Sequence, residues 1–130
     1  MVAAGLVIRS AHYPGRAPIE AYGNGGFRFA GMSHRGGLMC LPSGIHGWAA
    51  PAPDAIDEAS LAGVFAEAGA NGILLVGTGR EIAPLGQQVR QRCRAEGIVA
   101  EAMSTGAAVR TFNVLLAEER AVAAALIAVD

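Results

Sequence analysis

The chain has 130 residues, 52% of them hydrophobic and 16% charged, with a formal net charge of -1 at pH 7. This length suits one domain with its own core, and the composition excludes a disordered chain and a basic nucleic-acid surface. We expect a cytoplasmic protein, because residues 1–8 carry no basic residue before a short apolar run. No direct membrane insertion is expected either, since the apolar run 121–129 is well short of the roughly 20 residues that cross a bilayer.

The first part of the chain predicts an arm followed by a β-hairpin. Residues 1–17 mix Gly, Pro and small side chains and are expected to form a loosely ordered N-terminal arm, with a single α/β domain over residues 18–130. Residues 19–22 and 27–29 flank the cluster Gly23-Asn24-Gly25-Gly26. That cluster can supply the positive φ angles of a tight hairpin turn.

A strand, a loop and a helix are expected next. Residues 38–41 predict a short apolar strand that Pro42 ends, and residues 45–48 are expected to form a loop. Residues 54–57 can cap a helix. Its apolar residues recur at the i, i+3, i+4 and i+7 spacing of one buried stripe: Leu61, Val64, Phe65 and Ala68. Gly69 is expected to end this helix in the left-handed conformation.

The middle of the chain predicts a strand, a helix and a second strand. The run 73–76 is continuously apolar, as expected for a central strand covered on both faces. A helix is expected to begin at Pro84 and to end at Gly97. Its buried stripe is Leu85, Val89 and Cys93. Residues 98–102 predict the next strand.

The last third predicts a helix followed by an ambiguous segment. Ser104 or Thr105 can cap a helix that packs through Ala108, Phe112 and Leu115. Residues 121–129 are compatible with two structures, since Ala favours a helix while the unbroken apolar run suits a buried strand. Helix propensity alone predicts a helix there.

Several motifs occur in an order that is typical of a known family: Gly77-Thr78-Gly79, Gly97-Ile98-Val99, Met103, Thr105, Ala108, Arg110-Thr111-Phe112-Asn113-Val114-Leu115, Glu118 and Arg120, with Tyr22, Gly26-Phe27 and Trp48 upstream. From about residue 18 to residue 129 the chain resembles the Mth-type family of uncharacterised (DUF) proteins. That family also contains the adipogenesis-associated domain protein and the third assembly factor of mitochondrial NADH:ubiquinone oxidoreductase.

The resemblance implies a fold and a kind of function. The implied fold is α/β, a single compact three-layer β/β/α domain with a mixed sheet, in which residues 121–129 form a strand. Bacterial members largely lack an assigned activity, and the best-described relative assists assembly of a respiratory complex through protein contacts. The chain departs from the family at Phe112, where Tyr is usual, and at Glu119, where Gly is frequent.

Gly77-Thr78-Gly79 is the first candidate binding segment. After a strand, such a loop can direct backbone N–H groups at an anion, because glycine permits close approach and a helix start adds a positive dipole. The alternative is a tight strand-to-helix turn. Ile82 occupies the third glycine position of the dinucleotide motif G-x-G-x-x-G, although Glu101 lies near where a ribose-binding acid belongs.

Arg110 is the second candidate, together with Thr105 and Asn113. Arg110 can pair with a carboxylate or phosphate at the same edge of the sheet. Equally, it can form a structural salt bridge with Glu101 or Glu118. The structural interpretation is favoured, because Arg and Asn at a buried edge more often connect loops than bind ligands.

The remaining candidates have weaker support. Trp48 can anchor a protein partner, since Trp is enriched at interface hot spots, or it can cover the small core as a lid. His34 and His46 are expected to lie on the surface or in loops. Cys40 and Cys93 lie far apart without a CxxC pair, which predicts two buried thiols and no zinc site.

No catalytic constellation, cofactor or metal site is predicted. The leading hypothesis is a non-enzymatic binding domain that assists assembly of a respiratory complex, NADH:ubiquinone oxidoreductase, through contacts with its subunits, and a homodimer is one form it can take. The alternative is a small-anion or nucleotide-like ligand-binding protein, with enzymatic activity left open. Its site would consist of Gly77, Thr78, Gly79, Thr105, Arg110 and Asn113.

Overall fold

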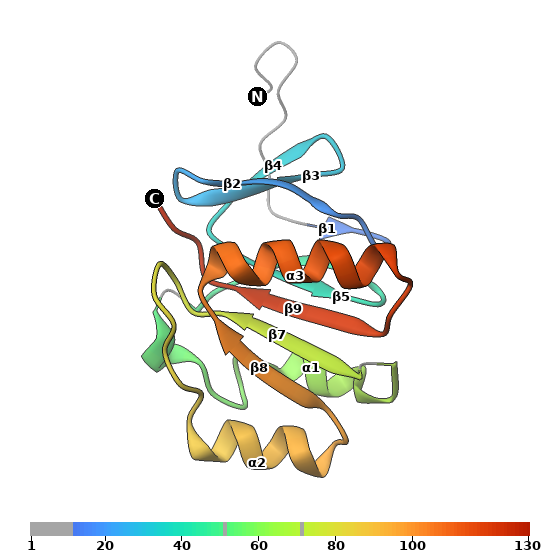
Figure 1. Ribbon diagram of the computed structural model, residues 1–130, viewed down its shortest axis with the longest axis vertical. Coiled ribbons are helices and arrows are strands. Elements are labelled where there is room, and N and C mark those ends of the chain that lie inside the picture. The colour runs from blue at the N-terminus through green and yellow to red at the C-terminus, as the bar shows by residue number, and fades with distance from the viewer. Residues whose placement is uncertain (1–11, 51, 71) are drawn as a thin grey trace.

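The computed structural model describes residues 12–50, 52–70 and 72–130 and arranges them in layers of strands and helices (Figure 1). The strands are β1 (His12–Tyr13), β2 (Ile19–Gly23), β3 (Gly26–Phe29), β4 (Met32–Arg35), β5 (Gly37–Leu41), β6 (Gly44–Trp48), β7 (Ile73–Gly77), β8 (Val99–Met103) and β9 (Val122–Leu126). The helices are α1 (Ala62–Ala66), α2 (Gln87–Ala95) and α3 (Thr105–Ala117), with 3-10 turns at Pro53–Ala55 and Ala68–Ala70.

The main sheet is mixed. Its strand order is β1-β6-β5-β9-β7-β8. Strand β7 pairs in parallel with both β8 and β9, whereas β9 pairs antiparallel with β5. The connection through α2 leads from β7 outward to β8, and the connection through α3 returns across β7 to β9. Because such crossovers are right-handed, α2 and α3 lie on opposite faces of the sheet.

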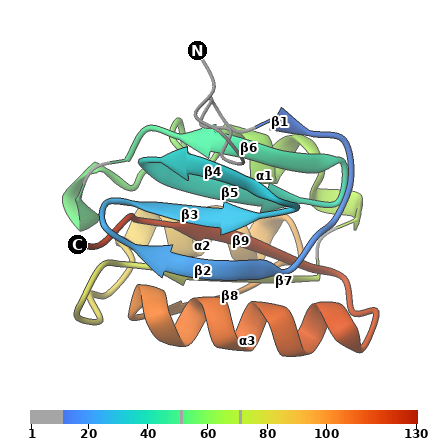
Figure 2. The ribbon, with the colours of Figure 1, turned by 90° about the horizontal axis from the view of Figure 1, so that it is seen from above.

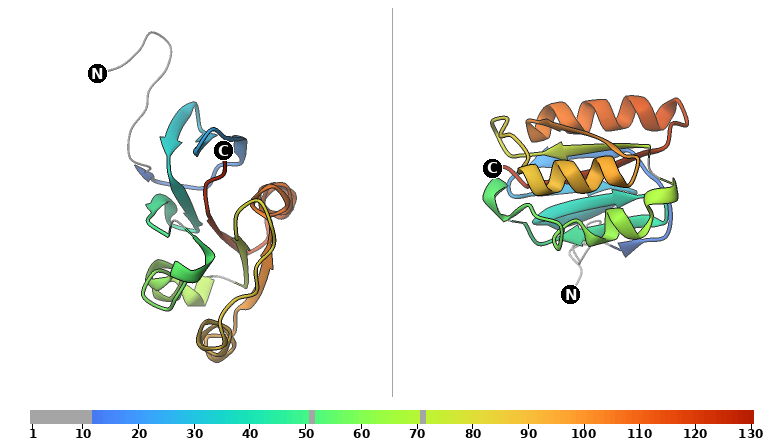
Figure 3. Two further views of the ribbon diagram at one scale, coloured as in Figure 1. Left: turned by 90° about the vertical axis from the view of Figure 1, so that its left-hand side faces the viewer. Right: turned by 90° about the horizontal axis from the view of Figure 1, so that it is seen from below.

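A second, smaller sheet and α3 form the layer on one side of the main sheet. The small sheet has the order β2-β3-β4, and Figure 2 shows it beside α3. The views in Figure 3 show α1 and α2 on the other side. The three layers confirm the α/β class and the three-layer arrangement with a mixed sheet that the resemblance implied.

Strand β9 divides the core into two clusters. Val122, Ala124 and Leu126 pack with α3 and the small sheet, while Ala123 and Ala125 pack with α1 and α2. All five side chains are at most 1% exposed, so β9 is covered on both faces. The strand implied by the resemblance for residues 121–129 is therefore confirmed, and the helix predicted by propensity alone is wrong, because tertiary burial outweighs the helix preference of Ala.

The first hairpin forms as predicted. Asn24 and Gly25 have φ angles of 53° and 79°, and they join β2 to β3. A second two-residue turn, Ala30-Gly31, has φ angles of 48° and 73° and joins β3 to β4. Within the expected arm, β1 pairs with β6; residues 1–11 lie outside the described part of the chain.

Two predicted elements differ in the structure. Residues 45–48 are not a loop but belong to β6, which gains its strand conformation from pairing with β5 on one side and β1 on the other. The helix expected from residues 54–57 is shortened to α1. Asp57 and Ser60 bond each other instead, with Ser60 N–H donating to Asp57 Oδ1 at 2.8 Å and Asp57 N–H donating to Ser60 Oγ at 2.9 Å. This local turn competes with helix formation.

The buried stripe of that segment is nevertheless largely as predicted. Leu61, Val64 and Phe65 are buried against the main sheet, and Ala68 is partly buried there. Gly69 belongs to a 3-10 turn and does not have a positive φ angle, so its predicted role as a left-handed stop is wrong.

The later elements match their predictions with small shifts. Helix α2 begins at Gln87, three residues after Pro84, and Gly97 follows it with a φ of 75°. Val89 and Cys93 form its buried side. Ser104 is the N-cap of α3, since its side chain accepts a hydrogen bond from the backbone N–H of Ala107.

Candidate functional site

Thr78 closes a tight loop after β7. Its hydroxyl donates to the carbonyl of Glu81 at 2.8 Å and accepts from the N–H of Ala83 at 2.9 Å. Its own backbone N–H donates to the carbonyl of Met103 at 2.9 Å, which continues the pairing of β7 with β8. The side chain is 3% exposed. Thr78 therefore fixes the path of residues 78–83.

Thr105, the first residue of α3, connects the ends of three strands. Its hydroxyl donates to the carbonyl of Ile127 at 2.7 Å and accepts from the N–H of Gly79 at 3.0 Å. Its backbone N–H donates to the carbonyl of Gly79 at 2.8 Å. A Cβ at Gly77 would lie 3.0 Å from both Cα and Oγ1 of Thr105, so a larger residue would push Thr105 away and glycine favours this close approach.

The structure thus places Gly77, Thr78, Gly79 and Thr105 at one junction, where Gly79 and Thr105 bond each other and Thr78 bonds the neighbouring backbone. The Gly79 N–H, which an anion would need, donates to Thr105. This arrangement favours the structural interpretation of a strand-to-helix junction. The ligand site at these residues stays a prediction.

Arg110 and Asn113 lie on α3, apart from that junction. Asn113 bonds the backbone of Ile19 in β2, accepting from its N–H at 2.8 Å and donating to its carbonyl at 2.9 Å. The exposed Arg110 forms no ion pair with any described residue, so neither expected salt bridge, to Glu101 or to Glu118, is present.

Tyr22 reaches across from β2 to the first turn of α3. A Cβ at Gly106 would clash with the Tyr22 hydroxyl and would lie 3.4 Å from Nη1 of Arg110. Gly106 therefore leaves room for the Tyr22 ring beside the Arg110 guanidinium. Sequence reasoning noted Tyr22 only as part of the family pattern, and the packing across the two elements depends on tertiary structure.

Trp48 lies in the core at the end of β6. Its side chain is 7% exposed, and its indole N–H donates to the carbonyl of Ser60 at 2.8 Å. Burial with a satisfied N–H favours the lid interpretation of this residue over the interface anchor. An anchoring role would require the segment around Ser60 to move.

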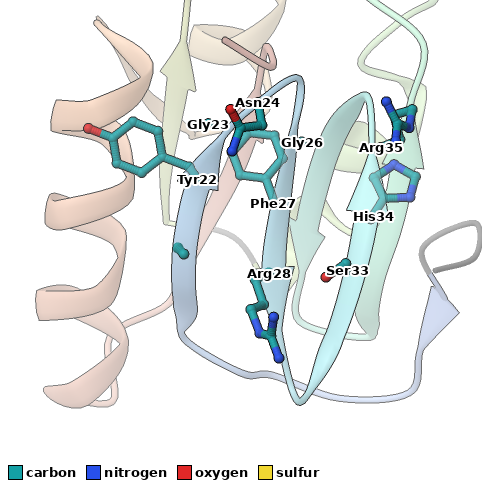
Figure 4. Close-up of a pocket in the computed structure, with 10 residues that line it drawn as sticks. Tyr22, Gly23, Asn24, Gly26, Phe27, Arg28, Ser33, His34 and Arg35 are labelled. Carbon is teal, nitrogen blue, oxygen red and sulfur yellow. The ribbon is translucent and has the colours of Figure 1, made fainter. Parts of the chain in front are cut away.

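A hollow of about 240 Å³ lies on the small sheet (Figure 4). Its lining comes from β2, β3, β4 and the turn between β2 and β3: Ala21, Tyr22, Gly23, Asn24, Gly26, Phe27, Arg28, Ser33, His34 and Arg35. Sequence analysis did not predict this site. The sequence signal for it is the pair of two-residue turns, Asn24-Gly25 and Ala30-Gly31, because together they set the register of β2, β3 and β4 and so decide which side chains share a face.

Both cysteine thiols lie in the protein interior, where burial favours their protonated form. Burial raises the pKa of the Cys40 thiol to about 12, and burial likewise raises the pKa of Cys93, with Arg92 opposing it. His34 Nε2 lies 3.0 Å from the carbonyl of Gly37, and the His46 ring packs edge-on against His12. Both thiols are buried, as predicted.

Residues 12–50, 52–70 and 72–130 offer neither a cluster of metal-binding side chains nor a membrane-spanning helix. No group of three His, Cys, Asp or Glu side chains is arranged to hold a metal ion in this part of the chain. None of its helices is both long and apolar enough to span a bilayer.

Comparison with protein families matches residues 19–127 to the family described as "Protein of unknown function (DUF498/DUF598)". An uncharacterized protein of Rhodobacter capsulatus is 44% identical over 119 residues, which cover 92% of this chain and 90% of that protein. Mouse NADH dehydrogenase [ubiquinone] 1 alpha subcomplex assembly factor 3 is 32% identical over 122 residues, covering 94% of this chain and 66% of that protein.

Solved structures show the same fold. A Bartonella henselae protein described as an outer membrane protein has a TM-score of 0.86 and 54% sequence identity, covering 92% of this chain and 100% of that one. A Bordetella pertussis protein described as an Mth938-like domain has a TM-score of 0.75 and 31% identity, covering 86% and 85% of the two chains.

Proposed function

We propose, from the premise that the chain belongs to the family of proteins of unknown function DUF498/DUF598, that it is a protein-binding domain that assists assembly of a respiratory NADH dehydrogenase complex. The observation that carries this proposal is the similarity to mouse assembly factor 3, which extends over 94% of this chain. The shared part is therefore nearly the whole layered unit and not a short motif. The match leaves about one third of the mouse protein outside it.

The geometry supports binding more than catalysis. The hydroxyls of Thr78 and Thr105, at the edge where open α/β sheets usually carry their chemistry, are bonded within the protein. The Cys40 thiol is held in its neutral, unreactive form by burial, which raises its pKa to about 12. The surface, by contrast, carries exposed charged side chains and a hollow on the small sheet, which suit contacts with a partner.

The proposed partner is a subunit of the respiratory complex, bound through protein contacts. A net charge of -1 with basic residues spread along the chain gives no support to a nucleic-acid partner. A cytoplasmic location and a homodimeric state remain predictions of the same proposal.

Removal of the protein from its own host tests the assembly role. Native gels of the deletion strain should show less assembled NADH dehydrogenase, with an accumulated subassembly, and re-expression of the chain should restore the complex. The tagged chain should co-purify with subunits of the immature complex. An unchanged amount of complex in the deletion strain, with no subunit on the tagged chain, would refute the proposal.

One observation favours a second candidate, an anion-binding site at the start of α3. The Arg110 guanidinium is unpaired among the described residues and lies near Gly106 in the first turn of α3, a position that the Tyr22 hydroxyl also approaches. A ligand that binds the native state must raise its melting temperature. Phosphate and nucleotides should then stabilise the unchanged chain and the Arg90→Ala variant but not Arg110→Ala, and no shift with any of them would exclude this candidate.

A further inference from the structure

The outward face of the small sheet carries two arginines on neighbouring strands. Strand register pairs Arg28 in β3 with Ser33 in β4, and Gly26 with Arg35. Arg28 and Arg35 are thus diagonal neighbours on the same face of the small sheet, because Arg35 lies two residues along β4 from Ser33, the direct partner of Arg28. Diagonal neighbours of this kind lie about 7–8 Å apart at the backbone, and the view in Figure 4 places the two side chains toward different ends of the hollow.

The positive charge on this face is only partly compensated. Arg35 forms no ion pair and no side-chain hydrogen bond within residues 12–50, 52–70 and 72–130. Arg28 faces Glu20 at 3.7 Å, but both side chains are more than 40% exposed, and such surface pairs contribute little. Glu20 also accepts a hydrogen bond from the N–H of Gly31. The face therefore attracts an anionic partner.

The shape between the arginines comes from small residues. Ala21, Gly23, Gly26 and Ser33 line the hollow, and none of them has a long side chain that would fill the space between the two arginines. Gly26 is required there, because a Cβ would clash with the carbonyl of His34. Tyr22, at 42% exposure, also lines the hollow, although its ring is directed toward α3, and Asn24 lines it from the turn between β2 and β3.

We propose that this hollow binds an extended acidic segment of a protein partner, with two carboxylates separated by one residue. Alternate side chains of an extended chain lie about 7 Å apart on one face, which matches the backbone separation of the diagonal neighbours Arg28 and Arg35. Each guanidinium then donates charge-assisted hydrogen bonds to one carboxylate. The small residues between them make room for the intervening part of the segment.

This inference rests on the proposed protein-binding function and names the chemistry of its partner. It does not depend on which complex the partner belongs to. Binding of an acidic segment in vitro can hold while the respiratory role fails, and the deletion experiment can succeed while this surface is not the one used. The peptide titration and the deletion experiment can therefore each refute one proposal without refuting the other.

The test is a titration of the isotope-labelled full chain with short peptides, followed by amide signals in NMR spectra. One peptide carries Glu at alternate positions, a second carries the same two Glu side by side, and a third replaces both by Gln. Inorganic phosphate is titrated separately. Arg28→Ala and Arg35→Ala remove one guanidinium each, and Arg90→Ala on α2 is the matched control, since that side chain is also exposed and unpaired within the described residues.

The alternating peptide should shift the signals of residues that line the hollow, including Gly23, Gly26 and Ser33. Its affinity should fall about tenfold in Arg28→Ala and in Arg35→Ala and should not change in Arg90→Ala, as expected for the loss of one charged contact. The adjacent-Glu peptide should bind more weakly and the Gln peptide should not bind. Equal binding of all three peptides, shifts at other residues, or phosphate binding at the hollow as tightly as the peptide would each overturn the proposal.

Discussion

The side-chain amide of Asn113 bonds both backbone groups of Ile19, accepting from the N–H at 2.8 Å and donating to the carbonyl at 2.9 Å. Ile19 begins β2, an outer strand of the small sheet. The amide therefore takes the place of a neighbouring strand and closes this edge with α3. One side chain thus ties the helix of the main sheet to the small sheet.

Asn113→Ala should destabilise the protein by about 2 kcal/mol, because two partly buried backbone groups lose their partner. Chemical denaturation monitored by circular dichroism measures this change. The control is Arg110→Ala, one turn away on the same helix, exposed and without an ion pair to a described residue, for which we expect a change within about 0.5 kcal/mol. Equal stability of the two variants would show that the Asn113 bonds contribute nothing.

Thr105→Val should cost a similar amount, about 2 kcal/mol, because it keeps the shape of the side chain and removes the hydroxyl that bonds Gly79 and Ile127. Thr105→Ser retains the hydroxyl and should lose less stability. Hydrogen exchange of the Gly79 amide provides a local measurement, and it should accelerate in Thr105→Val alone. A larger loss of stability in Thr105→Ser than in Thr105→Val would show that the methyl group of Thr105, and not its hydroxyl, stabilises the junction.

Glu119 departs from the family pattern, in which Gly is frequent, and has a backbone conformation that is unfavourable for residues other than glycine. It follows α3 with a φ of 60°, in the left-handed region where glycine carries no steric penalty. Glu119→Gly should therefore stabilise the protein by about 0.5–1 kcal/mol, after allowance for the greater freedom of glycine in the unfolded chain. Glu118→Gly, at a φ of -86°, should instead destabilise it. Thermal denaturation of both variants distinguishes these outcomes, and a loss of stability in Glu119→Gly would contradict the argument.

The elements predictable from sequence are those decided locally. The turn at Asn24-Gly25 needs two positive φ angles, which these residue types adopt readily, and the capped start of α3 needs only Ser104 and the residues after it. Strand β6 could not be predicted in this way. Its residues include Gly44, Gly47 and His46, which favour strands weakly, and its conformation depends on pairing with β1 and β5.

The candidate sites follow the same division. Gly77 and Thr105 come together because parallel strands end at one edge, which sequence reasoning can anticipate. Whether the polar groups at this junction bind a ligand or one another depends on distances between their atoms in the fold. Residue spacing along the sequence does not predict those distances. The pairing of Arg28 and Arg35 on one face requires the register of two successive hairpins, and the second turn, Ala30-Gly31, was not recognised as one.

Cys40 makes stability depend on pH. Its pKa is raised by burial from an ordinary value of 9.0 to about 12, so the folded state keeps the proton that the unfolded state releases between these values. The stabilisation is fully present below pH 9 and is lost as the pH rises toward 12. The free energy of unfolding should fall by up to about 1.4 kcal/mol per pH unit from this group.

Unfolding measured between pH 8 and pH 11 in the unchanged chain and in Cys40→Ala isolates that contribution. The variant is less stable at every pH because it loses packing, so the slopes are compared and not the values. The slope should be shallower in Cys40→Ala. Identical slopes would mean that the thiol does not titrate differently in the two states.

Glu101 protects the outer edge of the main sheet. Strand β8 is the last in the order, pairs with β7 and no other described strand, and directs the N–H of Val99 to Gly72. In a parallel pair, every second residue of β8 forms its backbone hydrogen bonds with β7. The backbone groups of the residues between them, Ala100 and Ala102, therefore point toward the outer edge of the sheet. Glu101 is exposed between them, and pairing of two copies about this position would bring like charges opposite each other.

Glu101→Val should therefore convert β8 into a strand that recruits a second copy. Size-exclusion chromatography with light scattering should show larger species than for the unchanged chain, increasingly so at higher concentration. Glu81→Val, another exposed acid without an ion pair to a described residue, should leave the elution unchanged. Adding Ala102→Pro to Glu101→Val should reverse the association, because proline removes an outward N–H while the bonds to β7 remain. If that double variant still associates, the new contact lies on the apolar face of β8 and not along its backbone.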